Sequence, residues 1–273
     1  MPGTLHFETP TALEYFSSLV ADDASFSVLE AAVSIAQDEY PGLDAQTVLS
    51  DIDAVADRLK RRIPADVVAL QRVRLLNQYF FQELGFGGNV NNYYDPRNSF
   101  VHEVLVRRRG IPITLATLYV ELASQIGLKA FGVSFPGHFL VKVSVEQGRQ
   151  AGEVVIDPFT GQSLSREELS ERLEPFKQRS GLVDDFEVPI GLYLQAASPR
   201  EIISRMLRNL KEIHKTQEDW PRLIAVLAGV ASATGFAPHD VTFYLRELAA
   251  SYHSYYDAER ILVDEEGVKL ARL

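Results

Sequence analysis

Apolar residues recur with helical spacing along the first hundred residues. One helix face carries Leu13, Phe16, Leu19 and Val20, and the pattern returns over residues 28–36, 48–59 and 67–84. Prolines and glycines separate these segments, and the glycine-rich run 85–88 ends the last one as a helix C-cap does. We therefore expect a helical amino-terminal region over residues 1–98.

The pattern changes in the middle of the chain. A short helix is expected over residues 99–109, and Pro112, which suits the first helical position, opens another helix that Gly127 ends. Alternating positions then predict strands over 130–135, 139–145 and 153–156, and Ser165 begins a capped helix. This order indicates an α+β core over residues 99–190, with helices on one side of a small antiparallel sheet.

Residues 191–273 return to helical spacing. Apolar stripes over 202–213 and 223–230 are followed by helices expected over 241–250 and from about Tyr255. Residues 219–227 align with 254–262, aromatic on aromatic, which predicts tetratricopeptide-like helical hairpins. Two copies are too few for a free-standing solenoid, so we expect this tail to pack on the core.

Composition narrows the class of protein. With 46% hydrophobic and 23% charged residues, the chain has the balance of an ordinary globular protein. No apolar run approaches the ~20 residues of a membrane helix, and no secretion signal is readable. The absence of cysteine excludes disulfides and thiolate metal sites. We expect a cytoplasmic protein that has no membrane segment and binds no cofactor.

Charge argues against nucleic acid as a partner. The net charge of −10 is unfavourable for phosphate contacts, and the one basic run is Arg107-Arg108-Arg109. Two interpretations of this run stay open. It is a solvated helix end favoured by the helix dipole, or a local site for an anion or an acidic partner.

One histidine and one aspartate stand where catalytic partners are often delivered. His138 opens a strand after a Pro-Gly turn, and Asp157 closes the next strand. If these strands pair as a meander, the two side chains lie within hydrogen-bond reach, and an Asp–His pair makes a competent base. The same pair is also a common structural hydrogen bond between strand ends.

The helix that starts at Pro112 is where a nucleophile belongs, because the helix dipole lowers the pKa of a thiol there. The chain has no cysteine, and the hydroxyl candidates are Thr114 and Thr117. Thr114 points about 200° away from the first helical position, and a hydroxyl ionises far less readily than a thiol. Capping or packing is the favoured role for Thr114.

Long strings of the chain resemble a known family. The segments 98–115, 135–141 and 156–159, which contain Gly110-Ile111-Pro112, Gly137-His138 and Asp157-Pro158, resemble the bacterial SirB-type family. That family belongs to the transglutaminase-like superfamily, whose fold is that of papain-like cysteine enzymes. The resemblance spans nearly the whole chain, and the tail is its weakest part.

The resemblance implies an inactive site. Active members carry cysteine at the helix start, then histidine, then aspartate; here Pro112 takes the cysteine position, His138 the histidine position and Asp157 the aspartate position. Proline offers no nucleophile, so acyl transfer through a thioester is closed to this chain. SirB-type proteins generally resemble one another in lacking that cysteine.

Several polar residues surround these positions in the sequence. Asn98, Glu103, Arg109 and Thr114 are candidates to line a binding cleft with the pair, or else to form ion pairs that fix the loop. The backbone N–H groups at the Thr114 helix end could stabilise an oxyanion. A metal site built from His138, Asp157 and His102 or Glu103 has no spacing signature, and we expect no metal.

Two functions follow from these residues. The first is a non-catalytic binding or scaffold module, a pseudoenzyme that recruits a protein partner. The second is a cysteine-independent hydrolase in which His138, oriented by Asp157, activates water. The proline at the nucleophile position favours the first.

Overall fold

The computed structural model describes residues 10–22, 26–147, 150–179 and 189–234, together with four single positions further on (246, 249, 250 and 253). The third and fourth helices expected in the tail, and with them the second copy of the helical repeat, lie outside the described residues. Within them the chain is mixed α+β, as the sequence predicted, and no helix is both long and apolar enough to cross a membrane.

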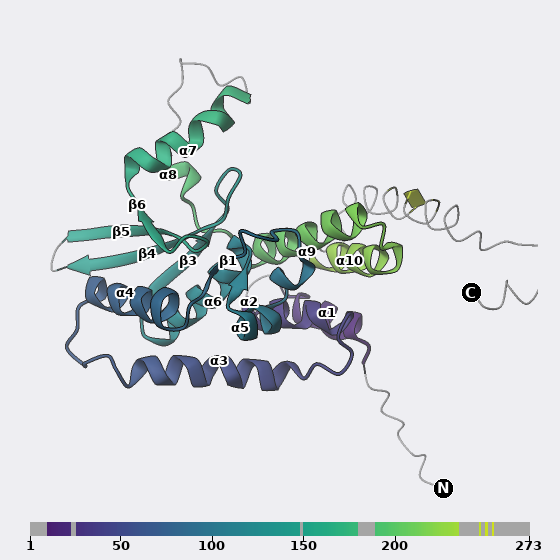
Figure 1. Cartoon of the computed structure of the whole chain (residues 1–273), viewed down its shortest axis with the longest axis horizontal. Helices are drawn as coiled ribbons and strands as arrows, with labels where there is room; N and C mark the ends of the chain where they lie inside the picture. The colour runs from purple at the N-terminus through teal and green to yellow at the C-terminus, as the bar shows by residue number, and fades with distance from the viewer. Residues whose placement is uncertain are drawn as a thin grey trace, which may run out of the picture.

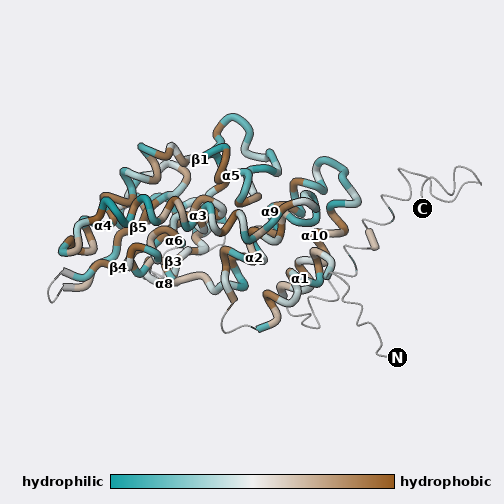
Figure 2. The backbone as a smooth tube through the Cα atoms, turned by 90° about the horizontal axis from the view of Figure 1, so that it is seen from below, coloured by the Kyte–Doolittle hydropathy of each residue, from teal (hydrophilic) through white to brown (hydrophobic). Residues whose placement is uncertain are grey.

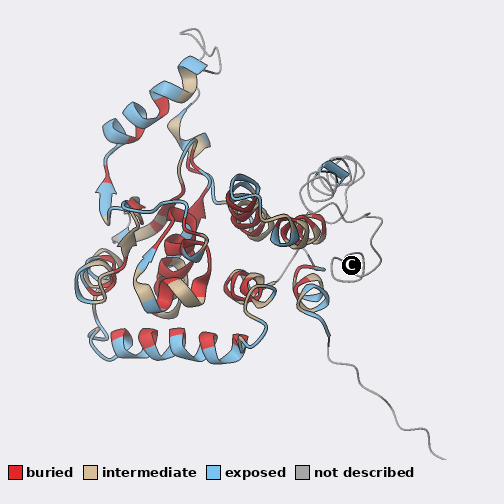
Figure 3. Ribbon diagram, turned by 45° about the vertical axis from the view of Figure 1, so that its right-hand side comes forward, coloured by how far each residue is buried: buried red, intermediate tan, exposed pale blue. Residues whose placement is uncertain are grey.

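The amino-terminal region is helical. Its elements are α1 (Ala12–Leu19), α2 (Val28–Ser34), the 3₁₀ turn η1 (Ile35–Gln37), α3 (Ala45–Lys60), α4 (Ala69–Asn77) and the π-helical turn η2 (Gln78–Glu83). Gly85 ends this stretch with φ +73°, which confirms the predicted cap. The outer helix α3 is exposed on one side and buried on the side that faces the protein (Figure 3).

The middle of the chain supplies a central helix and a sheet. Its elements are β1 (Gly87–Gly88), η3 (Pro96–Asn98), α5 (Val101–Arg107), β2 (Arg109–Gly110), α6 (Pro112–Gln125), β3 (Lys129–Val133), β4 (Leu140–Gln147), β5 (Gln150–Asp157) and β6 (Gln162–Leu164). Strands β3 to β6 form an antiparallel meander in sequence order, while β1 and β2 pair in parallel (Figure 1). The meander places the start of β4 beside the end of β5, because Val141 pairs with Ile156.

Helix α6 is the centre of the main core. The residues of its first two turns are all buried, as expected of a helix that is apolar on every side. It packs against β3 and β4 on one side and against α2, α3 and α5 on others. One continuous cluster of buried side chains joins α1 through α6, the sheet and the carboxy-terminal hairpin, so the same core runs across the expected boundaries at residues 98 and 190.

The other face of the sheet is also covered. Strands alternate between the two faces, so Val141 and Ile156 join the main core while Leu140 and Val155 face a second cluster. That cluster is completed by α7 (Arg166–Arg179) and by the chain around α8 (Ile190–Tyr193). The expectation that helices lie on one side only was therefore wrong, because both sets of alternating residues are apolar.

The last described helices form a hairpin, α9 (Pro199–Thr216) and α10 (Trp220–Ala233), that packs on α1 and α2. Apolar and polar residues alternate with the helical turn along α9 (Figure 2), and the apolar face enters the core. Arg200 fastens the hairpin to its surroundings: its guanidinium donates to the carbonyl oxygens of Ala233 and, at 2.8 Å, of Val20.

Glycine is required at β1. The Gly88 amide donates to the carbonyl oxygen of Phe159 at 2.9 Å, and the Phe159 ring lies so close that a Cβ on Gly88 would fall 2.3 Å from it. Phe159, two residues after the end of β5, is thus hydrogen-bonded to β1, the strand that pairs with Arg109–Gly110. This contact fixes the loop after Asp157 against the segment that starts α6.

Gly88→Ala should destabilise the protein by about 1–3 kcal/mol, because the added methyl group forces the Phe159 ring out of its place. Urea unfolding followed by circular dichroism measures the loss. Gly42→Ala is the matched control: a Cβ there meets nothing within 4 Å, so its change should stay within about 0.5 kcal/mol. Equal losses in the two variants would contradict the close packing at Gly88.

Candidate functional site

The strand ends bring His138 and Asp157 together. His138 lies in the turn before β4, where its amide donates to the Phe135 carbonyl at 3.0 Å and Gly137 adopts φ +71°. Asp157 is the last residue of β5, the neighbouring strand. The imidazole Nε2 lies 2.9 Å from Asp157 Oδ1, so the predicted pairing of these two residues is present.

The Asp157 carboxylate is fully occupied. Besides His138, it accepts a hydrogen bond from the Phe159 amide at 2.9 Å and one from Arg172 Nη1 of α7 at 2.9 Å. Its side chain is only 3% exposed. Burial alone would raise the pKa of Asp157, but the His138, Arg172 and Phe159 hydrogen bonds hold that pKa well below its usual range. Asp157 is therefore a charged anchor for three chain segments.

Pro112 occupies the first turn of α6 and is buried. The preceding amide, that of Ile111, donates to the Asn98 carbonyl at 3.2 Å, so the helix start is fastened to η3. The Asn89 amide donates to Gly110 at 3.2 Å, next to the Gly88 contact with Phe159. The helix start and the Asp157 loop are thus joined through β1.

The threonines of α6 face backbone carbonyls. Thr114 is fully buried, and its hydroxyl lies 3.5 Å from the Ser99 carbonyl oxygen, at the limit of a hydrogen bond. The Thr117 hydroxyl donates to the Ile113 carbonyl at 2.9 Å. These contacts give both residues packing roles, as the sequence favoured for Thr114.

Asn98 organises the loop that precedes it. Its side chain is buried; the amide nitrogen donates to the carbonyls of Asn92 (2.7 Å) and Tyr93 (3.1 Å), and its oxygen accepts from Asn89 (3.0 Å). Through these three hydrogen bonds Asn98 holds the loop 89–95 in shape. We call residues 89–95 the tyrosine loop.

The arginine run is divided among separate partners. Arg107 pairs with Asp95 at 3.1 Å, Arg108 lies 4.6 Å over the Phe86 ring, and Arg109 donates to the Gly85 carbonyl. Arg108 also takes a left-handed conformation, φ 60°, that ends α5. These contacts tie the segment to its neighbours and leave Arg107 and Arg108 partly buried, unlike the solvated helix end of the first interpretation.

Glu103 lies on α5 with a different set of neighbours. Its carboxylate is 3.9 Å from His102 Nε2, and burial together with this carboxylate raises the pKa of Tyr40. Within the described chain, no hydrogen bond or ion pair joins Glu103 to His138 or Asp157. The same part of the chain holds no group of three metal-ligating side chains.

Two arginines that were not predicted from the sequence lie beside the pair of His138 and Asp157. Arg172 bonds the aspartate, and Arg205 of α9 donates to the His138 carbonyl at 2.9 Å and to Ser134 Oγ at 2.7 Å. The Arg205 guanidinium also lies 5.4 Å from the centre of the Phe139 ring. An arginine on an amphipathic helix is usually expected to face solvent. Arg172 and Arg205 are therefore recognised only by their contacts with the strand ends in the folded protein.

Aromatic side chains form the rim next to this site. Tyr93 contacts Tyr94 at 5.3 Å and Phe159 at 6.0 Å between ring centres. Burial and Tyr94 raise the pKa of Tyr93, against an opposing effect of the Arg205 charge. Tyr93 is 44% exposed, Tyr94 73% and Val90 76%, so the tyrosine loop carries an exposed apolar patch on a hydrogen-bonded frame.

Two protein-family models match segments of the chain. The family model of the transglutaminase-like superfamily matches residues 46–208, and that of the DALR anticodon binding domain matches residues 198–273. The second match covers the tail in which the sequence suggested tetratricopeptide-like hairpins. No solved structure matches the chain.

Several curated proteins are similar to this chain. A UPF0162 protein of Xylella fastidiosa strain 9a5c is 38% identical over 207 residues, which are 76% of this chain and 71% of that protein. The UPF0162 protein PA3419 of Pseudomonas aeruginosa is 28% identical over 256 residues, 90% of this chain and 88% of its own length. An arginine–tRNA ligase of Polaromonas naphthalenivorans is 86% identical over 42 residues, 15% of this chain and 8% of the ligase. The chain therefore belongs to the transglutaminase-like superfamily and to the UPF0162 protein family.

Proposed function

We propose that this chain is a non-catalytic transglutaminase-like module that binds a protein partner. The observation that carries the proposal is Pro112, buried at the start of α6 in a chain without cysteine. Proline has neither a nucleophilic side chain nor an N–H to stabilise an oxyanion. The fold therefore retains the frame of the superfamily's site without the group that would form a covalent bond.

The surroundings of His138 favour a structural pair over a base. In an Asp–His pair that acts as a base, the carboxylate orients the imidazole and stabilises its charged form. Here Arg172 and the Phe159 amide share the Asp157 carboxylate, which weakens its effect on His138. The alternative, a hydrolase in which His138 activates water, has the retained 2.9 Å pair in its favour and this neutralised carboxylate against it.

The tyrosine loop is the surface best suited to a partner. Exposed aromatic side chains on a preorganised loop bind with little loss of conformational entropy, and tyrosine is enriched among residues that dominate binding energy. Val90, Tyr93 and Tyr94 supply such a patch, and Asn98 holds their backbone in place. Arg205 adds a positive charge beside it.

Two finer assignments belong to this proposal. The resemblance to the SirB-type family supports a regulatory role without turnover. A tetratricopeptide-like tail would add a second surface for a protein, and the helical hairpin of α9 and α10 is compatible with it. A cytoplasmic location fits both assignments.

A second candidate function concerns the tail. The DALR match over residues 198–273 and the 86% identity to an arginine–tRNA ligase over 42 residues favour contact with a tRNA anticodon arm. The net charge of −10 opposes such binding. The expectation that the chain binds no nucleic acid stays a prediction, and binding of tRNA by the tail would contradict it.

Photo-crosslinking in cells tests the partner surface. With p-benzoylphenylalanine in place of Tyr94, we expect a discrete crosslinked protein, because this side chain is the exposed end of the aromatic patch. Val68, 51% exposed on the edge of α4, is the control position and should give none. His138→Ala should leave this crosslink and complementation of a gene-deletion strain unchanged.

An activity assay on the purified protein decides between binding and hydrolysis. Purified protein should release no product from peptide, amide or glutamine substrates above a buffer blank. Turnover that disappears in both His138→Ala and Asp157→Asn would establish the hydrolase instead. Equal crosslinking from Tyr94 and Val68 would show that the tyrosine loop is no specific interface.

Asp157→Asn should lower the free energy of unfolding at pH 7 by about 2 kcal/mol, because the amide loses the charge that Arg172 and His138 bond. The folded pKa lies below the unfolded value, so the carboxylate's contribution is fully present above about pH 5. It is lost as the pH falls through the folded pKa. Urea unfolding from pH 7 to pH 2.5 should show the difference between the two proteins narrow progressively below about pH 5; a constant difference throughout would exclude the charge as the cause.

Filter binding with a tRNA-Arg transcript tests the tail. If the DALR match reflects function, the full chain should bind at low salt, and a variant ending after Thr234 should bind at least about tenfold more weakly. Circular dichroism checks that the shortened variant is folded, and duplex DNA of similar charge is the control ligand. Binding that is absent, or equal for tRNA and duplex, would remove this candidate.

A further inference from the structure

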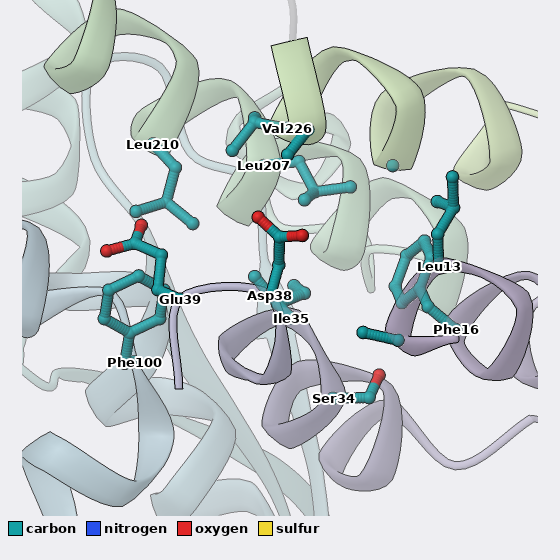
Figure 4. Close-up of a pocket in the computed structure, with 13 residues that line it drawn as sticks. Leu13, Phe16, Ser34, Ile35, Asp38, Glu39, Phe100, Leu207, Leu210 and Val226 are labelled. Atoms are coloured by element: carbon teal, nitrogen blue, oxygen red, sulfur yellow. The ribbon is translucent and has the colours of Figure 1, made fainter. Parts of the chain in front are cut away.

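A small pocket lies between the amino-terminal helices and the carboxy-terminal hairpin, away from the His138 site. Its volume is about 80 Å³. The walls are apolar and come from α1, α2 with η1, the start of α5, α9 and α10 (Figure 4). They include Leu13, Phe16, Phe100, Leu207 and Val226.

Two carboxylates interrupt this apolar lining. Asp38 and Glu39 follow η1, and Figure 4 shows the Asp38 carboxylate directed between Leu207 and Val226. Glu39 is already neutralised: His214 Nε2 lies 2.9 Å from one oxygen and Arg222 Nε 3.1 Å from the other. The two carboxylates therefore differ in what they can still bind.

Asp38 has no such partner. Within the described part of the chain, no hydrogen bond or ion pair ends on its carboxylate. Burial and the neighbouring Glu39 raise the pKa of Asp38, against the smaller opposing effects of Arg222 and His214. The pocket thus holds one negative charge that the protein leaves without a cation.

We propose that this pocket binds a small primary alkylammonium ion, with the ammonium group on Asp38 and the alkyl chain among Phe16, Leu207 and Val226. A carboxylate beside apolar walls complements a cation with an apolar stem, and the nearby phenylalanine rings favour a cation as well. A metal ion would need several oxygen ligands, and an anion would be repelled. The site is independent of the proposed binding function.

The size of the pocket limits the ligand. An engineered cavity of about 150 Å³ holds benzene, so about 80 Å³ has room for roughly three carbon-sized atoms. The branched end of 3-methylbutylamine therefore fills the pocket, and its nitrogen lies at the mouth where Asp38 is exposed. Longer polyamines would place their second charge in solvent.

Ligand-observed NMR on the full chain tests the proposal, with 3-methylbutylamine as the probe and 3-methylbutanol as its uncharged analogue. We expect saturation transfer to the amine and about tenfold weaker binding of the alcohol. Asp38→Asn should weaken amine binding about tenfold and leave alcohol binding unchanged. Asp38 is exposed, so this substitution leaves the core intact.

Two further variants complete the experiment. Ala225→Leu fills the pocket from a partly exposed position of α10 and should abolish binding of both probes. Asp51→Asn, on the exposed side of α3, removes an equal charge elsewhere and should change nothing. Three outcomes would overturn the proposal: amine binding that survives Ala225→Leu, amine binding that is unaffected by Asp38→Asn, or no detectable binding of the amine at about 10 mM. That concentration is on the order of the dissociation constants of the weakest small ligands.

Discussion

The structure depends on the complete burial of the first turns of α6. The first two turns of a helix that packs against a sheet on one side and against several helices on the others have no face to offer to solvent. Because protein interiors are close-packed, the start of this helix cannot shift without displacing the side chains around it. Everything that surrounds the site, from η3 and β1 to the strand ends, is positioned against this helix start.

That constraint gives proline a physical role at residue 112. Proline presets the dihedral angle of a first helical residue and loses no hydrogen bond there. A buried helix start gains from such rigidity, whereas a nucleophile needs access to substrate. Proline at residue 112 thus contributes rigidity to the buried start of α6.

Local chemistry explains what could be predicted from sequence. Pro112 and Gly127 mark the ends of α6, Ser165 caps α7 through Glu168, and alternation in the strands implied the meander that joins His138 to Asp157. The strand Gly87–Gly88 escaped prediction because glycine is depleted in strands, and it exists only through pairing with Arg109–Gly110.

The residues that complete the site and the pocket could not be found in this way. Arg172, Arg205 and Asp38 have ordinary spacing on or beside amphipathic helices, where charged side chains usually face solvent. Their partners lie far away in sequence, so their contacts are a property of the tertiary fold. The three-dimensional arrangement was therefore needed to separate them from the other charged residues.

Arg200 couples two parts of the chain that lie far apart in sequence. Its guanidinium bonds the carbonyl of Val20, the residue that caps α1, and that of Ala233, the last residue of α10. A movement at either helix end therefore removes a hydrogen-bond acceptor from the same side chain that holds the other, so the two ends shift together.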